Sequence, residues 1–270
     1  MKYFPLKSAA AESTRMTSPI SQGPGHRPPG GSCAIGILAK APRPGSCKTR
    51  LCPPLTPEES VALSRCFLQD TAENVSTICL QKEGVIGVAV YTPVECEQDF
   101  EKLLPDDFLL VPQRGESLGD RLHYAAEDLF LAGYDSVCLI GSDSPTLPSS
   151  CLVAMVKYLK CSRDGVVIGP TIDGGYYAIG LKAPRRRLFE DISWSTDRVF
   201  EQTKARIAEL ALPHITLPIW YDADDEVALT RLFDHLCRKG QPRRSNSGYL
   251  ANHTRRLLNR LFLTEDTSRT

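Results

Sequence analysis

The chain has 270 residues and no formal net charge; 42% of its residues are hydrophobic and 24% are charged. These proportions are typical of globular proteins with one large domain or two small ones, and they exclude collagen-like and disordered chains. No apolar run approaches the ~18 residues that a membrane helix needs, and a zero net charge gives no support for nucleic-acid binding, so we expect neither a membrane span nor a nucleic-acid partner.

Strand-like and helix-like segments alternate along the chain. The apolar run 33–39 predicts a buried strand, and Thr56, Pro57 and Glu59 predict the start of a helix. Further strands are expected at 85–91, 108–111, 136–140, 166–168, 176–181 and 214–217, with helices at 95–104, 118–129, 152–159, 199–210 and 229–236. This order predicts a three-layer α/β/α fold with a mostly parallel sheet, and ligands beyond the carboxyl ends of its strands.

The charge is distributed unevenly around this region. Residues 1–31 and 238–270 are basic, which leaves 20 basic and 29 acidic residues between them. Because the region between them is acidic, its lysines and arginines in loops after strands are candidate functional residues. We therefore expect three parts: a disordered N-terminal tail at 1–31, one folded domain at 32–238, and a basic linker with a short C-terminal helix at 239–270.

The ten cysteines include no C-x-x-C pair and no Cys/His cluster at zinc spacing. Several lie in apolar runs, where a cysteine usually serves as a small hydrophobic side chain. We interpret them as reduced thiols and expect a cytoplasmic protein.

A basic loop follows the first predicted strand. It contains Lys40, Pro42, Gly45, Lys48 and Arg50. Backbone amides near Gly45 and these cations suit a diphosphate or triphosphate. The loop is neither a Walker loop nor a G-x-G-x-x-G sequence, so it does not indicate those folds. A solvated basic loop is the alternative interpretation.

Carboxylates follow two of the other buried strands. Asp143 comes after the strand at 136–140, where it could hold Mg²⁺ or Mn²⁺ or could cap the next helix. Asp222 and Asp224 follow the last strand and could complete a metal site with Asp143. Asp224 and Asp225 could also cap the following helix, and we expect both roles to hold, for different carboxylates.

A turn-like segment follows the strand at 166–168. Asp173, Gly174 and Gly175 could form a plain hairpin connection, because Asp-Gly is a strong turn signal. Two glycines followed by Tyr176 also suit a backbone that approaches a ligand closely.

Two weaker features lie outside these loops. Asp120 and Arg121 are expected on the polar side of the helix at 118–129, where they could face a nucleotide or only solvent. Trp194 precedes another helix and is expected to be either a core residue or part of a lid.

Taken together, the loops resemble the radical-SAM/selenodomain-associated transferase family, whose members are taken to be GT-A-like glycosyltransferases. The resemblance covers residues 33–236 and rests on five segments in order: Ala39-Lys40-Ala41-Pro42 through Lys48-Thr49-Arg50-Leu51, Gly141-Ser142-Asp143-Ser144-Pro145-Thr146-Leu147-Pro148, Asp173-Gly174-Gly175-Tyr176-Tyr177, Trp194-Ser195-Thr196 and Trp220-Tyr221-Asp222-Ala223-Asp224. It implies a nucleotide-diphospho-sugar transferase fold, with the nucleotide over the first loop and a metal at Asp143. The D-x-D of many GT-A enzymes is reduced here to Gly141-Ser142-Asp143, with one carboxylate.

The same pattern is similar to 2-phospholactate guanylyltransferase and other nucleotidylyltransferases of this fold. Their Lys-Ser-Arg-Leu sequence is close to Lys48-Thr49-Arg50-Leu51. Both chemistries place phosphates between a basic loop and a metal, and they differ in which bond breaks.

The first hypothesis is glycosyl transfer from a nucleotide sugar to a small-molecule acceptor, with Mg²⁺ or Mn²⁺. Lys48 and Arg50 would neutralise the leaving diphosphate, and Asp173 would take the acceptor's proton. The acceptor side would comprise Asp173, Gly174, Gly175, Tyr176 and Trp194. The alternatives are transfer of NMP from an NTP to a phosphorylated or carboxylated acceptor, and a non-catalytic nucleotide-binding protein.

Overall fold

The computed structural model describes residues 28–45, 47–237 and 248–263. Most of the predicted N-terminal tail, at 1–27, and the predicted linker, at 239–247, lie outside these residues. None of the helices in the described part combines the length and apolar character that crossing a membrane requires.

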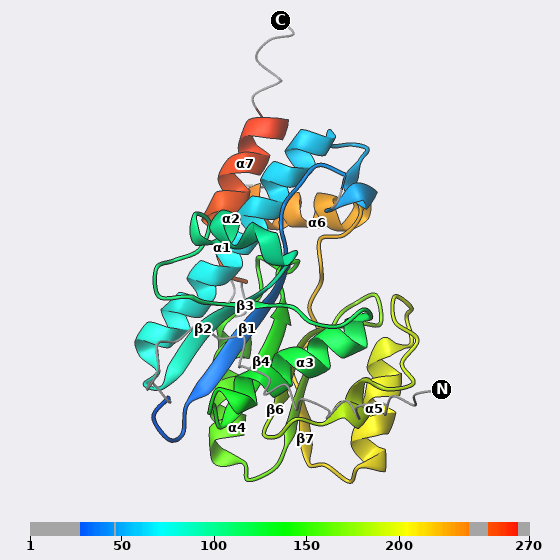
Figure 1. The fold of residues 1–270 in the computed structure, drawn as a ribbon. Helices are drawn as coiled ribbons and strands as arrows, with labels where there is room; N and C mark the ends of the chain where they lie inside the picture. Colours follow the sequence, from blue (N-terminus) through cyan, green and yellow to red (C-terminus); the bar gives the residue numbers. More distant parts are fainter. Residues whose placement is uncertain (1–27, 46, 238–247, 264–270) are drawn as a thin grey trace, which may run out of the picture.

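Seven strands form one sheet in the order β3-β2-β1-β4-β6-β5-β7 (Figure 1). Their bounds are β1 (Cys33–Lys40), β2 (Val85–Thr92), β3 (Leu109–Pro112), β4 (Ser136–Gly141), β5 (Val166–Pro170), β6 (Tyr176–Leu181) and β7 (His214–Thr216). Only β6 is antiparallel to its neighbours, β4 and β5; every other neighbouring pair is parallel. The carboxyl ends of the other six strands therefore meet at one edge, which confirms the mostly parallel sheet.

The helices alternate with the strands as predicted. They are α1 (Pro57–Gln81), α2 (Glu97–Glu101), α3 (Leu118–Leu131), α4 (Ser149–Cys161), α5 (Val199–Glu209), α6 (Glu226–Cys237) and α7 (Asn252–Phe262), with short 3-10 helices η1 (Thr49–Leu51), η2 (Val94–Cys96) and η3 (Arg186–Phe189). Thr56 and Glu59 form the capping box that starts α1.

The helix predicted at 95–104 is split and shorter. A 3-10 turn precedes α2, which ends at Glu101. The N–H groups of Leu103 and Leu104 then bond to the carbonyl of Phe100. Pro105 disfavours a helical conformation for Leu104, which explains why the helix stops there.

The helices cover both faces of the sheet. α1 and α4 pack on one face around Ile35 and Ile37, while α3 and α5 pack on the other around Leu129 and Ile179. Because successive side chains of a strand point to opposite faces, each buried strand contributes to both layers. The fold is thus the predicted three-layer α/β/α arrangement (Figure 1).

The first turn of α3 differs from the predicted amphipathic stripe. Leu118, expected in the core, is 47% exposed, whereas Gly119, expected on the polar side, is buried. A Cβ atom on Gly119 would lie 2.7 Å from the carbonyl of Phe189 and 2.8 Å from the Trp194 ring nitrogen. The chain packs so closely over this turn that only glycine fits there.

The C-terminal helix α7 lies alongside α1 (Figure 1). Leu257 and Leu258 are buried in a third apolar cluster between α1, α6 and α7. Asp70 on α1 accepts hydrogen bonds from the backbone N–H groups of His253, at 3.0 Å, and Thr254, at 2.8 Å. A side chain of α1 therefore caps α7 and holds it against the domain.

Candidate active site

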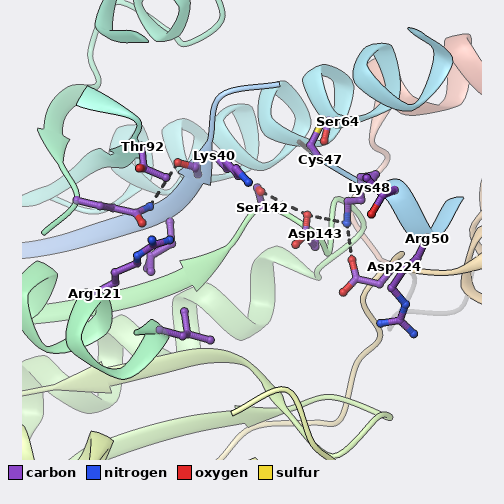
Figure 2. Close-up of a pocket in the computed structure, with 15 residues that line it drawn as sticks. Lys40, Cys47, Lys48, Arg50, Ser64, Thr92, Arg121, Ser142, Asp143 and Asp224 are labelled. Atoms are coloured by element: carbon purple, nitrogen blue, oxygen red, sulfur yellow. Dashed lines mark hydrogen bonds and ion pairs between the residues drawn. The ribbon is translucent and has the colours of Figure 1, made fainter. Parts of the chain in front are cut away.

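Four loops meet at the carboxyl edge of the sheet, and they follow β1, β4, β5 and β7. A cavity of 340 Å³ lies between the first two loops and the start of α3 (Figure 2). Its lining includes six charged side chains, Lys40, Lys48, Arg50, Arg121, Asp143 and Asp224. The predicted basic loop and two of the predicted metal ligands thus face one cavity.

Among these side chains, Lys48 contacts both carboxylates of the cavity. Its Nζ lies 2.7 Å from Asp143 Oδ1 and 2.6 Å from Asp224 Oδ1, and it donates to the carbonyl of Ala223 at 3.0 Å (Figure 2). It also lies 5.1 Å from the centroid of the Phe67 ring. The ammonium group therefore joins the loops after β4 and β7.

The local sequence explains how Lys48 reaches this position. Its backbone is left-handed, with φ of 50°, and it caps η1 at the end of the proline-rich loop. The hydroxyl of Ser60, on the first turn of α1, donates to the carbonyls of Cys47 and Lys48 at 3.1 and 3.3 Å. The start of α1 thus anchors the loop directly beside the lysine.

The ammonium group of Lys48 is buried, with 6% of its side chain exposed, while Asp143 and Asp224 are 44% and 43% exposed. Burial alone would lower the pKa of Lys48, but the two carboxylates outweigh it and raise the pKa above its ordinary value. The lysine is therefore a permanent cation at physiological pH.

Asp222 is the most buried carboxyl group of the site. Burial raises its pKa to about 7, and the negative charges of Asp143, Asp224 and Asp173 act in the same direction. A hydrogen bond donated by the hydroxyl of Ser144 acts against them. Asp222 thus exchanges a proton near neutral pH.

A second, smaller cavity of 180 Å³ adjoins the first. Asp173, Asp222, Asp225 and Arg231 line it, and it shares Arg50 and Asp224 with the larger cavity. Asp225 also accepts a hydrogen bond from the N–H of Ala228 at 2.8 Å and so caps α6. The expected helix cap is thus Asp225, while Asp224 pairs with Lys48, and the metal role of Asp222 or Asp224 stays a prediction.

The segment 171–175 is the hairpin connection between β5 and β6. Gly174 has a φ of 88°, and a Cβ atom there would lie 2.1 Å from the carbonyl oxygen of Asp197. Asp173 Oδ1 accepts from the hydroxyl of Thr171 at 2.5 Å and from the N–H of Gly175 at 3.2 Å. The turn therefore holds the Asp173 carboxylate at the edge of the smaller cavity.

The residues suit a metal bound by two carboxylates. Mg²⁺ commonly takes one or two carboxylates together with substrate phosphates and water. Asp143 and Asp224 lie close enough to share one cation, which here is the ammonium group of Lys48. With Asp222 they do not form a three-ligand cluster. Over the described ranges, the only three such side chains with donor atoms within 4.8 Å of one another are Asp70, Glu73 and His253. Both oxygens of Asp70 already cap α7.

Several predicted residues lie away from the two cavities. Pro42 and Gly45 line neither cavity. Asp120 completes a capping box with Ser117 at the start of α3. The rings of Tyr176 and Trp194 pack edge to face, with centroids 6.3 Å apart, in the core beneath α5.

The cavities also contain residues that the sequence analysis did not single out. Gln113 directly follows β3 and donates from Nε2 to the carbonyl of Val90 at 2.7 Å. Because Gln113 follows a predicted strand, the sequence could have indicated it as a candidate site residue. Arg231 lies within α6 and stacks 5.5 Å from the centroid of the Tyr221 ring. Nothing in its local sequence distinguishes it.

Residues 77–196 match a family described as "Uncharacterized protein conserved in bacteria (DUF2064)", which covers less than half of the chain. A search of curated proteins finds no match. The association with radical-SAM proteins therefore stays a prediction.

Solved structures are similar to this chain, and the Desulfovibrio structure among them supports the fold. A Desulfovibrio desulfuricans G20 protein, assigned provisionally as a nucleotide-diphospho-sugar transferase, superposes with a TM-score of 0.71 at 27% identity, over 85% of this chain and 97% of that chain. CMP:2-keto-3-deoxy-manno-octonic acid synthetase complexed with CTP superposes with a TM-score of 0.46 at 14% identity, over 74% of this chain and 96% of that chain. For 4-diphosphocytidyl-2C-methyl-D-erythritol synthase the TM-score is 0.43 at 15% identity, over 84% of this chain and 98% of that chain. The chain has a nucleotide-diphospho-sugar transferase-like fold, as expected.

Proposed function

We propose that this protein transfers a glycosyl group from a nucleotide-diphospho-sugar to a small-molecule acceptor. The observation that carries the proposal is the Lys48 ammonium group, held between Asp143 and Asp224 in a cavity with further cations around it. The likeness to the Desulfovibrio protein supports it, because that protein is provisionally assigned to the same class of enzyme.

The diphosphate would lie in the larger cavity. Lys48 carries its charge at all physiological pH values, and Arg50 and Arg121 reach the same space from η1 and α3. Preorganised positive charge stabilises the negative charge that develops on a leaving diphosphate, and such stabilisation commonly contributes more to catalysis than any other effect. The bond between the sugar and the diphosphate would break at the border with the smaller cavity.

Asp143 and Asp224 would hold Mg²⁺ or Mn²⁺, which when bound supplies further charge neutralisation at the diphosphate. The protein's part is to keep both carboxylates close without a ligand, and the ammonium group of Lys48 does so by offsetting their repulsion. Asp222 accepts a hydrogen bond from Ser144 and borders the smaller cavity.

The acceptor would occupy the smaller cavity. Asp173 Oδ1 is held by two hydrogen bonds, whereas Oδ2 accepts none from the part of the chain that the structure describes. This oxygen is therefore free to take a proton from an acceptor hydroxyl group. Arg231, on the facing helix, would orient a polar acceptor.

The test is a thermal-shift screen with UDP, GDP, their sugars and nucleoside triphosphates, with and without Mn²⁺. A ligand at 100 times its dissociation constant stabilises the folded protein by about 2.7 kcal/mol. We expect metal-dependent stabilisation by one nucleotide sugar, lost in Asp143→Asn and kept in the control Asp106→Asn, an exposed residue outside both cavities.

The same samples distinguish the alternatives. Selective stabilisation by a triphosphate, with release of pyrophosphate when acceptors are added, would replace glycosyl transfer by nucleotidyl transfer. Nucleotide binding with no turnover across a broad panel of donors and acceptors would leave the protein as a non-catalytic nucleotide binder.

A further inference from the structure

A third cavity lies at the opposite edge of the sheet from the candidate active site. Its volume is 800 Å³, within the range of small-molecule sites. The starts of β1 and β4, the ends of α1 and α4, and the residue that follows β6 surround it. Neither of the cavities at the carboxyl edge shares a residue with it.

The lining of this cavity is strongly basic. Lys82, Lys157, Lys160 and Lys182 contribute four positive charges, and Glu83 contributes the one negative charge. This excess stands out in a region where 29 acidic residues outnumber 20 basic ones. We call this space the lysine cavity.

No acid in the described part of the chain forms an ion pair with the four ammonium groups. Within residues 28–45, 47–237 and 248–263, the ion pairs within 4.0 Å include none of these lysines. Lys160 Nζ donates to a backbone carbonyl, that of Glu83, at 2.5 Å. The cavity therefore has a net positive potential that a bound anion would neutralise.

Helix ends explain part of this arrangement but not all of it. Lys82 follows the end of α1, and Lys157 and Lys160 lie in the last turns of α4, where cations offset the negative end of the helix dipole. Lys182 follows a strand and has no such reason to be there. Four cations from three separate segments thus line one cavity.

The uncharged part of the lining includes a buried polar residue and two apolar side chains. Ser136 lines the cavity, is 1% exposed and lies beside Cys33, its partner on the neighbouring strand. Val153 and Val156 of α4 supply an apolar wall.

We propose that the lysine cavity binds a small molecule that carries two or more phosphate groups, at a site separate from the active site. Each phosphate brings close to two negative charges, and lysine is an established phosphate ligand that acts as a point charge. The apolar wall would contact the non-phosphate part of the molecule.

The test is the affinity for inorganic tripolyphosphate, measured by isothermal titration calorimetry on the full chain without divalent metal at physiological ionic strength. We expect Lys157→Gln/Lys182→Gln to weaken one binding event about tenfold, since two ion pairs are lost. Lys102→Gln/Lys204→Gln, with the same change of charge outside the lysine cavity, should leave this event unchanged. Thermal unfolding of each variant without ligand shows whether the variant is folded.

A third variant tests whether tripolyphosphate binds in the lysine cavity or in the candidate active site. Lys40→Gln/Arg121→Gln removes cations of the candidate active site and should leave the same binding event intact. The proposal is overturned if tripolyphosphate does not bind, if only this third variant weakens it, or if both lysine pairs weaken it equally. Citrate that binds as tightly as tripolyphosphate would overturn the assignment to phosphate.

Discussion

The backbone N–H of Ala223 donates a hydrogen bond to the carbonyl of Asp143 at 2.9 Å. This bond joins the loop after β4 to the loop after β7, and it sets the separation between the side chains of Asp143 and Asp224. Lys48 then fits between the two carboxylates. The geometry of the site thus depends on backbone contacts between loops as well as on the charged side chains.

Lys48→Met retains the length of the side chain and removes its charge. We expect loss of transferase activity and a decrease of about 1–2 kcal/mol in the free energy of unfolding, because two half-exposed carboxylates would face each other without a cation. Urea unfolding measures the stability. Lys40→Met, at the exposed end of β1, is the matched control. Equal stability of the two variants would show that the carboxylates do not need the ammonium group.

Gly174→Ala should destabilise the hairpin between β5 and β6. The left-handed φ and the 2.1 Å approach to the Asp197 carbonyl both oppose a Cβ atom, so we expect a loss of about 1–3 kcal/mol. The measurement is thermal or urea unfolding. Gly30→Ala is the control, since a Cβ atom there meets nothing within 4 Å. A neutral effect of Gly174→Ala would mean that the turn adopts another conformation.

Asp70→Ala should loosen α7. The partly buried N–H of His253 and the buried N–H of Thr254 would lose their acceptors at a cost of about 1–3 kcal/mol. Asp70→Asn keeps one carbonyl acceptor, so its effect should be intermediate. Hydrogen exchange of the α7 amides locates the change. Exchange that rises uniformly over the whole domain would contradict a local role for this contact.

His235 should make stability depend on pH. Burial lowers its pKa, and its Nδ1 lies 2.7 Å from the hydroxyl oxygen of Tyr221. Because the unfolded chain takes up the proton more readily, the contribution of His235 is complete above the unfolded pKa of about 6.5 and declines as the pH falls below it.

The check is the free energy of unfolding of wild type and His235→Gln between pH 7.5 and pH 5, values that we choose to bracket that pKa. The wild type should lose more stability on acidification than the variant. His214→Gln, at an exposed position on β7, should retain the wild-type slope. Parallel curves for wild type and His235→Gln would exclude this role.

The sequence was sufficient to predict the main elements of the fold and the edge of the sheet at which the candidate residues meet. Apolar runs and the capping box at Thr56 are local signals, and the rule that ligands lie beyond strand ends is independent of sequence detail. The predicted loops after β1, β4 and β7 therefore meet as expected. Lys48, Asp143 and Asp224 come together in the larger cavity.

Other features depend on contacts that a local pattern does not contain. Tyr176 and Tyr177 are neighbours on one strand and point to opposite faces, and the pattern does not say which of them enters the core beneath α5. The cap of α7 comes from Asp70, far away in the chain. Asp120 was different, because Ser117 three residues earlier already indicated a helix cap.

The reversed strand β6 limits where the chain can change its length. It begins beside the Asp173 hairpin and ends at Leu181, directly before Lys182 in the lysine cavity, so six residues span the sheet from one edge to the other. Hydrogen bonds to β4 and β5 fix its register on both sides. One inserted residue would turn every following side chain to the other face of the sheet. Insertions and deletions during evolution are therefore expected in the surface loops and not between Asp173 and Lys182.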